Sequence, residues 1–267
     1  MAGNDPWIRE LRGAERPRAR VVFFPHAGGA ASFFFPFARR FPEGYDVSAV
    51  QYPGRQDRLG EPFVTTVEGL ADQVTPSLRR LAAGPAPLVL FGHSMGASVA
   101  FEAVLRLAAL GAGGRCRLVV SGRGAPSAPR EDPVLRTDQE ILDHVTGLGG
   151  TDSAVVTSPE LMELLLPAIR NDYRAVERYR PAPDAVADVP VLCLTGDRDP
   201  RATVEEAAAW KSHTTAGFRL EVLPGDHFYL SDHADTVVRF TAEHATAGDQ
   251  PGAPGRRRPE EVAPHSD

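Results

Sequence analysis

The chain has 267 residues, of which 42% are hydrophobic, and its formal net charge is −6 at pH 7. This length fits one large α/β domain or two small ones, and the apolar share is sufficient for a sizeable core. The negative charge argues against general binding to nucleic acid or to an anionic membrane. Cys116 and Cys193 are the two cysteines, too few for a disulfide framework or a cysteine-rich metal site. We expect both to be buried thiols in a reducing compartment.

Both ends of the sequence are polar. Residues 1–20 lack the apolar segment of a signal peptide, and no apolar run approaches membrane-spanning length. We therefore expect a soluble cytoplasmic protein. Residues 1–19 are expected to form an N-terminal extension and 20–246 the folded domain. Residues 247–267, which are rich in Gly, Pro and charge, are expected to form a disordered tail.

Short apolar segments alternate with helical patterns from Val21 onward. The segments rich in Val, Leu and Phe predict strands that are buried on both faces. They lie at 20–24, 47–52, 88–92, 117–121, 189–195 and 218–223. Helical patterns lie at 32–40, 67–81, 97–110, 203–213 and 232–244. Repeated strand–helix units indicate an α/β protein with a mostly parallel, doubly wound sheet.

Residues 125–188 interrupt this alternation, because they contain no convincing strand. Thr137 and Glu140 have the spacing of a capping box, which opens a short helix. A second helix is predicted to begin at Ser158-Pro159 and to continue to about Tyr179, with a kink or break at Pro167. An insertion at strand ends favours a lid over an active site, and a helical pair packed on the sheet edge is the alternative.

Ser94 is the candidate nucleophile. It stands in Gly92-His93-Ser94-Met95-Gly96, between a predicted strand and a predicted helix. The pattern Gly-x-Ser-x-Gly in this context predicts a sharp turn that lifts the serine hydroxyl out of the sheet. Glycine is expected on both sides, since a side chain there would crowd the strand or the helix.

A serine nucleophile needs a base, and in this arrangement an acid and then a histidine follow later in the chain. His227 comes directly after the last predicted strand, and Asp197 and Asp199 follow the strand before it. We expect Asp199 to be the acid and Asp197 to bond the loop backbone. His93, beside the nucleophile, is expected to pack in the core. Surface or tail positions are expected for His144, His213, His233, His244 and His265.

The negatively charged oxygen of a tetrahedral intermediate needs two backbone N–H donors. Met95, which follows the nucleophile at a helix start, is expected to supply one. The Gly-rich loop at residues 25–29 is expected to supply the other, from Ala27, with Gly28 as the alternative. His26 is expected to fix this loop by hydrogen bonding. The phenylalanines at 33–37 are expected in the core, although part of the cluster could line an acyl channel.

Several spaced motifs resemble type II thioesterases, the free-standing editing enzymes of polyketide and nonribosomal peptide synthetases. The similarity covers about residues 21–244, and a segment at 167–173 looks like the lid helix of that family. The motifs are Pro25-His26-Ala27-Gly28-Gly29, Tyr52-Pro53-Gly54-Arg55, Gly92-His93-Ser94-Met95-Gly96, Gly196-Asp197-Arg198-Asp199 and Gly225-Asp226-His227-Phe228.

The resemblance implies an α/β-hydrolase fold with a helical lid. It implies hydrolysis of aberrant or stalled acyl groups on the phosphopantetheine arm of an acyl or peptidyl carrier protein. Ser94, Asp199 and His227 match the catalytic triad of the family, and Ala27 and Met95 match its oxyanion donors. No cofactor and no metal are expected, and the protein is expected to be a monomer. A basic patch that docks an acidic carrier would draw on Arg55, Arg58, Arg123 and Arg130.

Other functions remain open at this point, because a fold and a triad do not define the substrate. A general carboxylesterase, an acyl-CoA thioesterase and a chain-releasing cyclase would use the same residues. A non-catalytic scaffold that binds carrier proteins is the alternative from another class. The presence of Ser94, Asp199 and His227 together argues against a scaffold.

Overall fold

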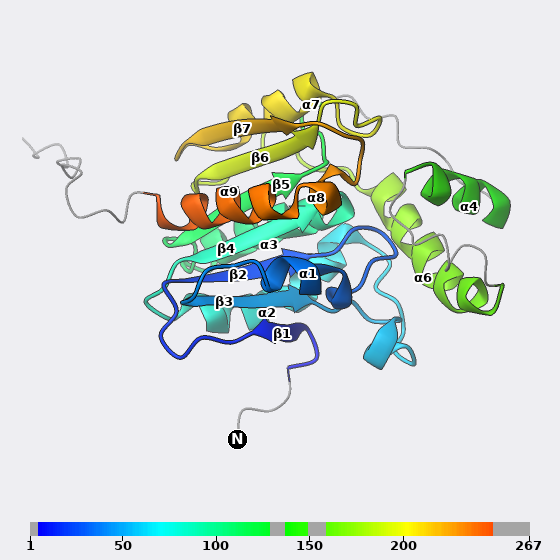
Figure 1. Cartoon of the computed structure of the whole chain (residues 1–267), viewed down its shortest axis with the longest axis horizontal. Coiled ribbons are helices and arrows are strands. Elements are labelled where there is room, and N and C mark those ends of the chain that lie inside the picture. Colours follow the sequence, from blue (N-terminus) through cyan, green and yellow to red (C-terminus); the bar gives the residue numbers. More distant parts are fainter. Residues whose placement is uncertain (1–4, 129–136, 149–158, 248–267) are drawn as a thin grey trace, which may run out of the picture.

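The computed structural model describes residues 5–128, 137–148 and 159–247. Figure 1 shows a twisted sheet of seven strands with helices on both faces. The strand order is β1-β3-β2-β4-β5-β6-β7, in which β1 pairs with β3 antiparallel and every other neighbouring pair is parallel. The bounds are β1 Ile8–Arg12, β2 Ala19–Phe24, β3 Tyr45–Val50, β4 Leu88–His93, β5 Cys116–Ser121, β6 Val191–Gly196 and β7 Phe218–Leu223.

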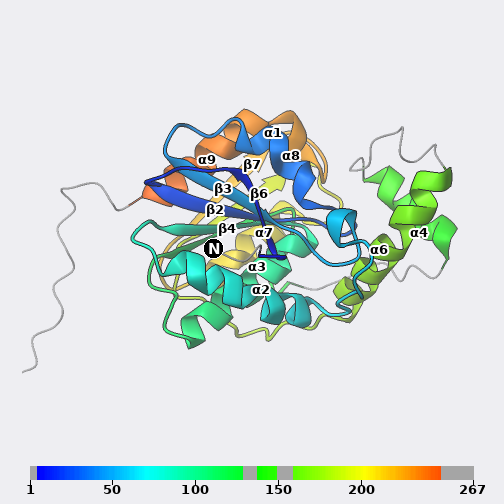
Figure 2. The ribbon, with the colours of Figure 1, turned by 90° about the horizontal axis from the view of Figure 1, so that it is seen from below.

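Helices cover both faces of this sheet. Figure 2 shows α2 and α3 on one face and α1, α8 and α9 on the other. The bounds are η1 Ala31–Phe34, α1 Phe35–Ala38, η2 Gln56–Arg58, α2 Val67–Ala82, α3 Met95–Ala109, α4 Asp138–Gly147, α6 Pro159–Arg178, α7 Val204–Ala208, η3 Ala209–His213, α8 Tyr229–Asp232 and α9 Ala234–Thr246. Each helix described is too short or too polar to cross a bilayer.

The central strands are apolar at successive positions because both of their faces are buried. In β2, Val22 and Phe24 pack in the cluster beneath α2 and α3, whereas Val21 and Phe23 pack in the cluster beneath α1 and α9. Since side chains alternate between the faces of a strand, one continuous apolar run supplies both halves of the core.

All six predicted strands are present, with ends displaced by a few residues at most. Strand β1 was not predicted, and its sequence Ile-Arg-Glu-Leu-Arg carries three charges in five residues. As an edge strand it has one free side and partly exposed side chains, so it lacks the apolar run that marks the central strands. Cys116 and Cys193 are buried free thiols, and burial raises the pKa of Cys116 to about 11.

Two predicted helices are divided in the structure. The pattern at 203–213 forms α7 followed by the 3-10 helix η3, and the pattern at 232–244 begins inside α8 and continues as α9. The short pattern at 32–40 is likewise part 3-10 helix and part α-helix. Periodicity predicts which face is apolar, but it does not distinguish a continuous helix from two short ones in tandem.

The helical insertion, which we define as α4 and α6, lies at one end of the sheet (right in Figure 1). The predicted capping box is present, since Thr137 Oγ1 accepts from Glu140 N at 3.2 Å and Glu140 Oε2 accepts from Thr137 N at 2.9 Å. The expected N-cap Ser158 lies outside the described residues. A kink or break was expected at Pro167, and the break is wrong, because α6 continues through this residue as one helix. Pro167 is exposed, so water can bond the carbonyl that the proline leaves unpaired.

Candidate active site

Ser94 occupies a strained turn between β4 and α3. Its backbone has φ 54° and ψ −118°, a region that residues other than glycine seldom adopt. The Ser94 N–H donates to the Ser121 carbonyl of the neighbouring strand β5 at 2.8 Å, which holds the turn against the sheet. A strained serine at a strand end is the geometry expected of an exposed nucleophile.

The glycines on either side of Ser94 are required by space. A Cβ atom on Gly92 would lie 2.2 Å from the Gly96 carbonyl oxygen, and one on Gly96 would lie 2.0 Å from the Phe24 carbonyl oxygen. Both contacts are with backbone, which cannot move aside cheaply. The close approach of α3 to β2 therefore depends on glycine at position 96.

His227 and Asp199 form a buried pair in the loops after β7 and β6. His227 Nδ1 lies 2.9 Å and 3.0 Å from the two carboxylate oxygens of Asp199. The side chains are 3% and 0% exposed, so water does not compete for this contact. Asp197 instead accepts from Gly225 N at 2.8 Å. With its proton on Nδ1, the imidazole has Nε2 available to accept a hydroxyl proton.

A pocket of about 530 Å³ brings the other candidate residues together. Ser94 and His227 both line it, and Asp199 lies outside the lining. One wall of the pocket belongs to the helical insertion and is mostly apolar. The residues of that wall are Leu142, His144, Val145, Thr146, Leu148, Met162, Leu165, Ile169, Tyr173 and Val176.

Ala27 and Met95, the expected oxyanion donors, both line the same pocket. Met95 is the first residue of α3, where the N–H has no acceptor inside the helix. In the loop after β2, the Gly28 N–H donates to Asp172 Oδ2 at 2.8 Å. No group within the described residues accepts a hydrogen bond from the Ala27 N–H. The sequence left Ala27 and Gly28 as alternative oxyanion donors. Of these two, only the Ala27 N–H is left free by the described residues to donate to a bound ligand.

Comparisons with known proteins identify the family of this chain. The family described as Thioesterase domain matches residues 19–244. The probable cadicidin biosynthesis thioesterase of Streptomyces griseus is 46% identical over 86% of this chain, and the chain spans 63% of that relative's length. Thioesterase PikA5 of Streptomyces venezuelae is 42% identical over 89% of this chain and 85% of its own. The chain belongs to the thioesterase family.

A solved structure of a type II thioesterase has a similar fold. The type II thioesterase BorB from the borrelidin biosynthetic cluster superimposes with a TM-score of 0.82 at 42% identity. The match covers 92% of this thioesterase and all of BorB. The predicted α/β-hydrolase architecture, a mostly parallel sheet with helices on both faces, is confirmed.

Two further histidines, His93 and His26, lie near His227, and neither was assigned to the site from the sequence. The ring of His93 lies 5.0 Å from that of His227, and its Nδ1 bonds Ser121 Oγ at 3.0 Å. Ser121 Oγ in turn bonds Tyr229 Oη at 2.7 Å. Burial, followed by the nearby His227, lowers the pKa of His93 well below its ordinary value. His93 is thus a neutral ring that packs against the candidate base.

His26 differs from its expectation. Its Nδ1 is buried and has no hydrogen-bond partner among the described residues, and its ring makes T-shaped contacts with Phe33 and Phe228 instead. Burial, followed by the charge of His227, lowers its pKa to about 3. The main chain of His26 does stabilise the loop, because its carbonyl accepts from Gly29 N at 2.9 Å.

The expected basic docking patch was wrong for three of its four members. Arg55, Arg58 and Arg123 are 3%, 5% and 8% exposed. Arg58 donates to Glu61 and to the Gln51 carbonyl. These three arginine side chains are buried and do not form an exposed basic surface. Arg130 lies outside the described residues.

Other side chains also depart from their expected exposure. His213 and His244 are buried, and His213 bonds the Ala185 carbonyl and Ser127. The phenylalanine cluster follows its expectation in part, since Phe34 and Phe37 are core residues and Phe33 lines the pocket, whereas Phe35 is 46% exposed. No group of three or more potential metal ligands lies close together within the described residues.

Proposed function

We propose that this thioesterase hydrolyses acyl thioesters on the phosphopantetheine arms of carrier proteins that serve polyketide or nonribosomal peptide synthesis. The observation that carries the proposal is the pocket that Ser94 shares with His227, whose imidazole is backed by the buried Asp199. The names of its relatives, which refer to cadicidin and borrelidin biosynthesis, support the carrier-bound substrate.

In this mechanism Ser94 attacks the thioester carbonyl, and His227 Nε2 takes the hydroxyl proton. Asp199 orients the imidazole through Nδ1 and stabilises its positive charge. The oxyanion of the tetrahedral intermediate accepts hydrogen bonds from the Ala27 and Met95 N–H groups. The C–S bond then breaks, and the thiolate takes the proton from His227, leaving an acyl ester on Ser94.

The second half of the reaction repeats these roles with water. His227 removes a proton from water as its oxygen attacks the acyl ester. The ester C–O bond breaks, the proton returns to Ser94, and the free acid leaves. The apolar wall of the helical insertion would receive the acyl chain, since it lines the same pocket as Ser94.

The test is mass spectrometry of an acyl carrier protein that bears a short acyl chain, after incubation with wild type or Ser94→Ala. We expect wild type alone to return the carrier with a free phosphopantetheine thiol. Hydrolysis of acyl-CoA or simple esters without activity on the carrier would assign a general hydrolase instead. Turnover by Ser94→Ala would contradict the role of Ser94.

Loss of all activity would leave the scaffold alternative, and fluorophosphonate labelling separates that case. A competent Ser94 forms a stable covalent adduct with this reagent, whereas a non-catalytic scaffold does not. We expect one adduct per chain in wild type and none in Ser94→Ala.

A further inference from the structure

Arg55 and Asp172 form a buried ion pair that the catalytic mechanism above does not use. Arg55 follows β3, and Asp172 lies in α6 of the helical insertion. The guanidinium meets the carboxylate with two hydrogen bonds, Nη1 to Oδ2 at 2.6 Å and Nη2 to Oδ1 at 3.0 Å. The side chains are 3% and 1% exposed. Burial acts to lower the pKa of Arg55, but the adjacent carboxylate outweighs it and the pKa is raised.

The same two side chains hold the loop after β2. Asp172 Oδ2 accepts from the Gly28 N–H at 2.8 Å, and Arg55 Nη1 donates to the Gly29 carbonyl at 3.2 Å. These backbone groups follow Ala27 directly. The ion pair therefore restrains the segment that positions the Ala27 N–H.

Packing supports the same connection between the loop and α6. A Cβ atom on Gly28 would lie 2.5 Å from Ile169 Cγ1, so the loop backbone lies directly against the helix. Gly28 also has φ +75°, which glycine adopts without strain. The hydrogen bond from Gly28 to Asp172 thus spans a tightly packed junction.

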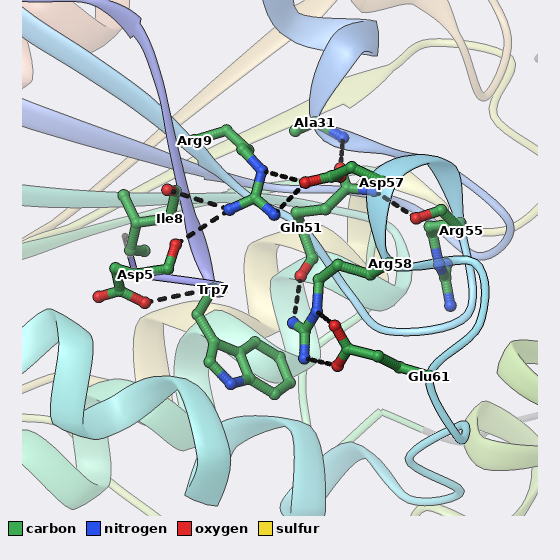
Figure 3. A network of polar contacts seen from close by, with 10 residues as sticks. All are labelled: Asp5, Trp7, Ile8, Arg9, Ala31, Gln51, Arg55, Asp57, Arg58 and Glu61. Carbon is green, nitrogen blue, oxygen red and sulfur yellow. Dashed lines mark hydrogen bonds and ion pairs between the residues drawn. The ribbon is translucent and has the colours of Figure 1, made fainter. Parts of the chain in front are cut away.

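The Arg55 segment is itself fixed from the other side. Gln51 Oε1 accepts from the Ala31 N–H at 2.9 Å, and Gln51 Nε2 donates to the Arg55 carbonyl at 3.1 Å (Figure 3). Gln51 is fully buried. Gln51 and Arg55 therefore join the loop after β2 to the segment after β3. Asp172 joins both to α6.

We propose that Arg55 and Asp172 are positioning residues for the oxyanion site. By engaging the Gly28 N–H and the Gly29 carbonyl, they orient the loop so that the Ala27 N–H donates into the pocket. Because Asp172 belongs to α6, a correctly placed oxyanion donor requires that α6 be packed against the loop. This inference rests on the proposed function, in which the Ala27 N–H binds the oxyanion.

A carboxylate is suited to this position because it can accept from Gly28 and from both nitrogens of Arg55 at once. A buried ion pair is often no more stabilising than an apolar pair of similar shape. Replacement of both charges should therefore separate positioning from stability. Leucine has the branched shape of aspartate, and methionine is long and unbranched like the arginine stem.

The test compares wild type, Asp172→Asn, Arg55→Lys and the double variant Arg55→Met/Asp172→Leu on one acyl carrier thioester. We expect the double variant to have a melting temperature near that of wild type, with kcat lower by about 10- to 100-fold and KM changed less than about threefold. Asp172→Asn should lose kcat similarly and also lose stability, since it leaves Arg55 without a counterion. Arg55→Lys keeps the charge but replaces the planar fork by one nitrogen, so it should lose less kcat than the double variant without matching wild type.

The matched control is Glu61→Gln, which weakens the neighbouring Arg58–Glu61 pair without touching the loop after β2. Its kcat should equal that of wild type within about twofold. An alkyl boronic acid gives a second readout, because it adds to Ser94 as a tetrahedral adduct with an oxygen in the oxyanion site. Its affinity should fall in the double variant by the same factor as kcat/KM.

A double variant with wild-type kcat and wild-type boronic acid affinity would overturn the inference. Failure of the double variant to fold would also contradict it, because the pair would then be required for the fold itself. Failure of the proposed function is distinguishable from both. In that case wild type itself would not hydrolyse the thioester, whatever residues stand at 55 and 172.

Discussion

Asp197 and Asp199 are two residues apart in one loop, yet they meet different partners. Asp199 contacts the imidazole of His227, whereas Asp197 accepts a hydrogen bond from the Gly225 N–H. The interaction with Gly225 ties the loop after β6 to the loop that carries His227. One aspartate thus aligns the two loops and the other contacts the candidate base.

Substitution Asp199→Asn should lower kcat by about 10⁴-fold, because an amide favours the wrong imidazole tautomer and cannot stabilise the imidazolium. The matched control is Asp197→Asn, in which the amide oxygen can still accept from Gly225. We expect that variant to stay within about threefold of wild type. Steady-state hydrolysis of an acyl thioester measures both, and equal losses in the two variants would contradict the assignment of Asp199.

At the scale of elements, the turn at Ser94 depends on how closely α3 approaches β2. The Gly96 position faces the carbonyl of Phe24, the last residue of β2. Both elements are anchored in the core, so neither can move without disturbing several others.

Gly96→Ala should therefore destabilise the protein by several kcal/mol, at or beyond the usual cost of about 1–3 kcal/mol for overpacking. The matched control is Gly114→Ala, at a position where an added Cβ meets nothing within 4 Å. It should change the free energy of unfolding by about 0.5 kcal/mol or less. Urea unfolding compares the two, and equal stability would show that the turn is less constrained than its geometry indicates.

Helix α4 is held differently from the main domain. The described apolar contacts between α4 and α6 form a small separate cluster around Ile141, Met162 and Ile169. An element with so small a core depends more on local interactions such as its cap.

Thr137→Ala removes the capping box of α4 and should weaken that helix by about 1 kcal/mol. We expect faster amide hydrogen exchange in α4 with little change in the melting temperature of the whole protein. Thr203→Ala removes the equivalent box of α7, which packs on the main sheet, and should instead lower global stability. Unchanged exchange in α4 would mean that packing on α6 alone holds the helix.

At the scale of the whole molecule, buried neutral histidines make stability depend on pH. Burial, with a smaller effect from Arg117, lowers the pKa of His244 to about 4 from an ordinary value of 6.5. Between these values the unfolded chain binds more protons than the folded one. Stability therefore rises with pH from about 4 to 6.5 and is lost as the pH falls through this range.

His244→Gln should reduce this dependence, because glutamine does not titrate. We expect a smaller difference between the free energies of unfolding at pH 4.5 and pH 7 than in wild type. The slope should shrink without disappearing, since His26 and His93 also have lowered pKa values. Urea unfolding at both pH values measures this difference. An unchanged slope would show that the pKa of His244 is the same in the folded and unfolded states.

The sequence by itself determined the central strands, the turn at Ser94 and the loops that carry Asp199 and His227. These features follow from local patterns, because a buried parallel strand needs an apolar run and a sharp turn needs glycine. Parallel strands bring their carboxyl ends to one edge, so the order of the motifs predicted which side chains would lie close together. The catalytic roles of these residues stay predictions until the substitutions are measured.

Only the tertiary structure decided which polar residues are interior. Arg55 and Asp172 are 117 residues apart in the chain, and neither has a local pattern that distinguishes it from a surface charge. Their burial depends on the packing of α6 against the loop after β2, which no short segment encodes. The edge strand β1 was missed for a related reason, because its pairing with β3 rests on backbone hydrogen bonds rather than on an apolar run.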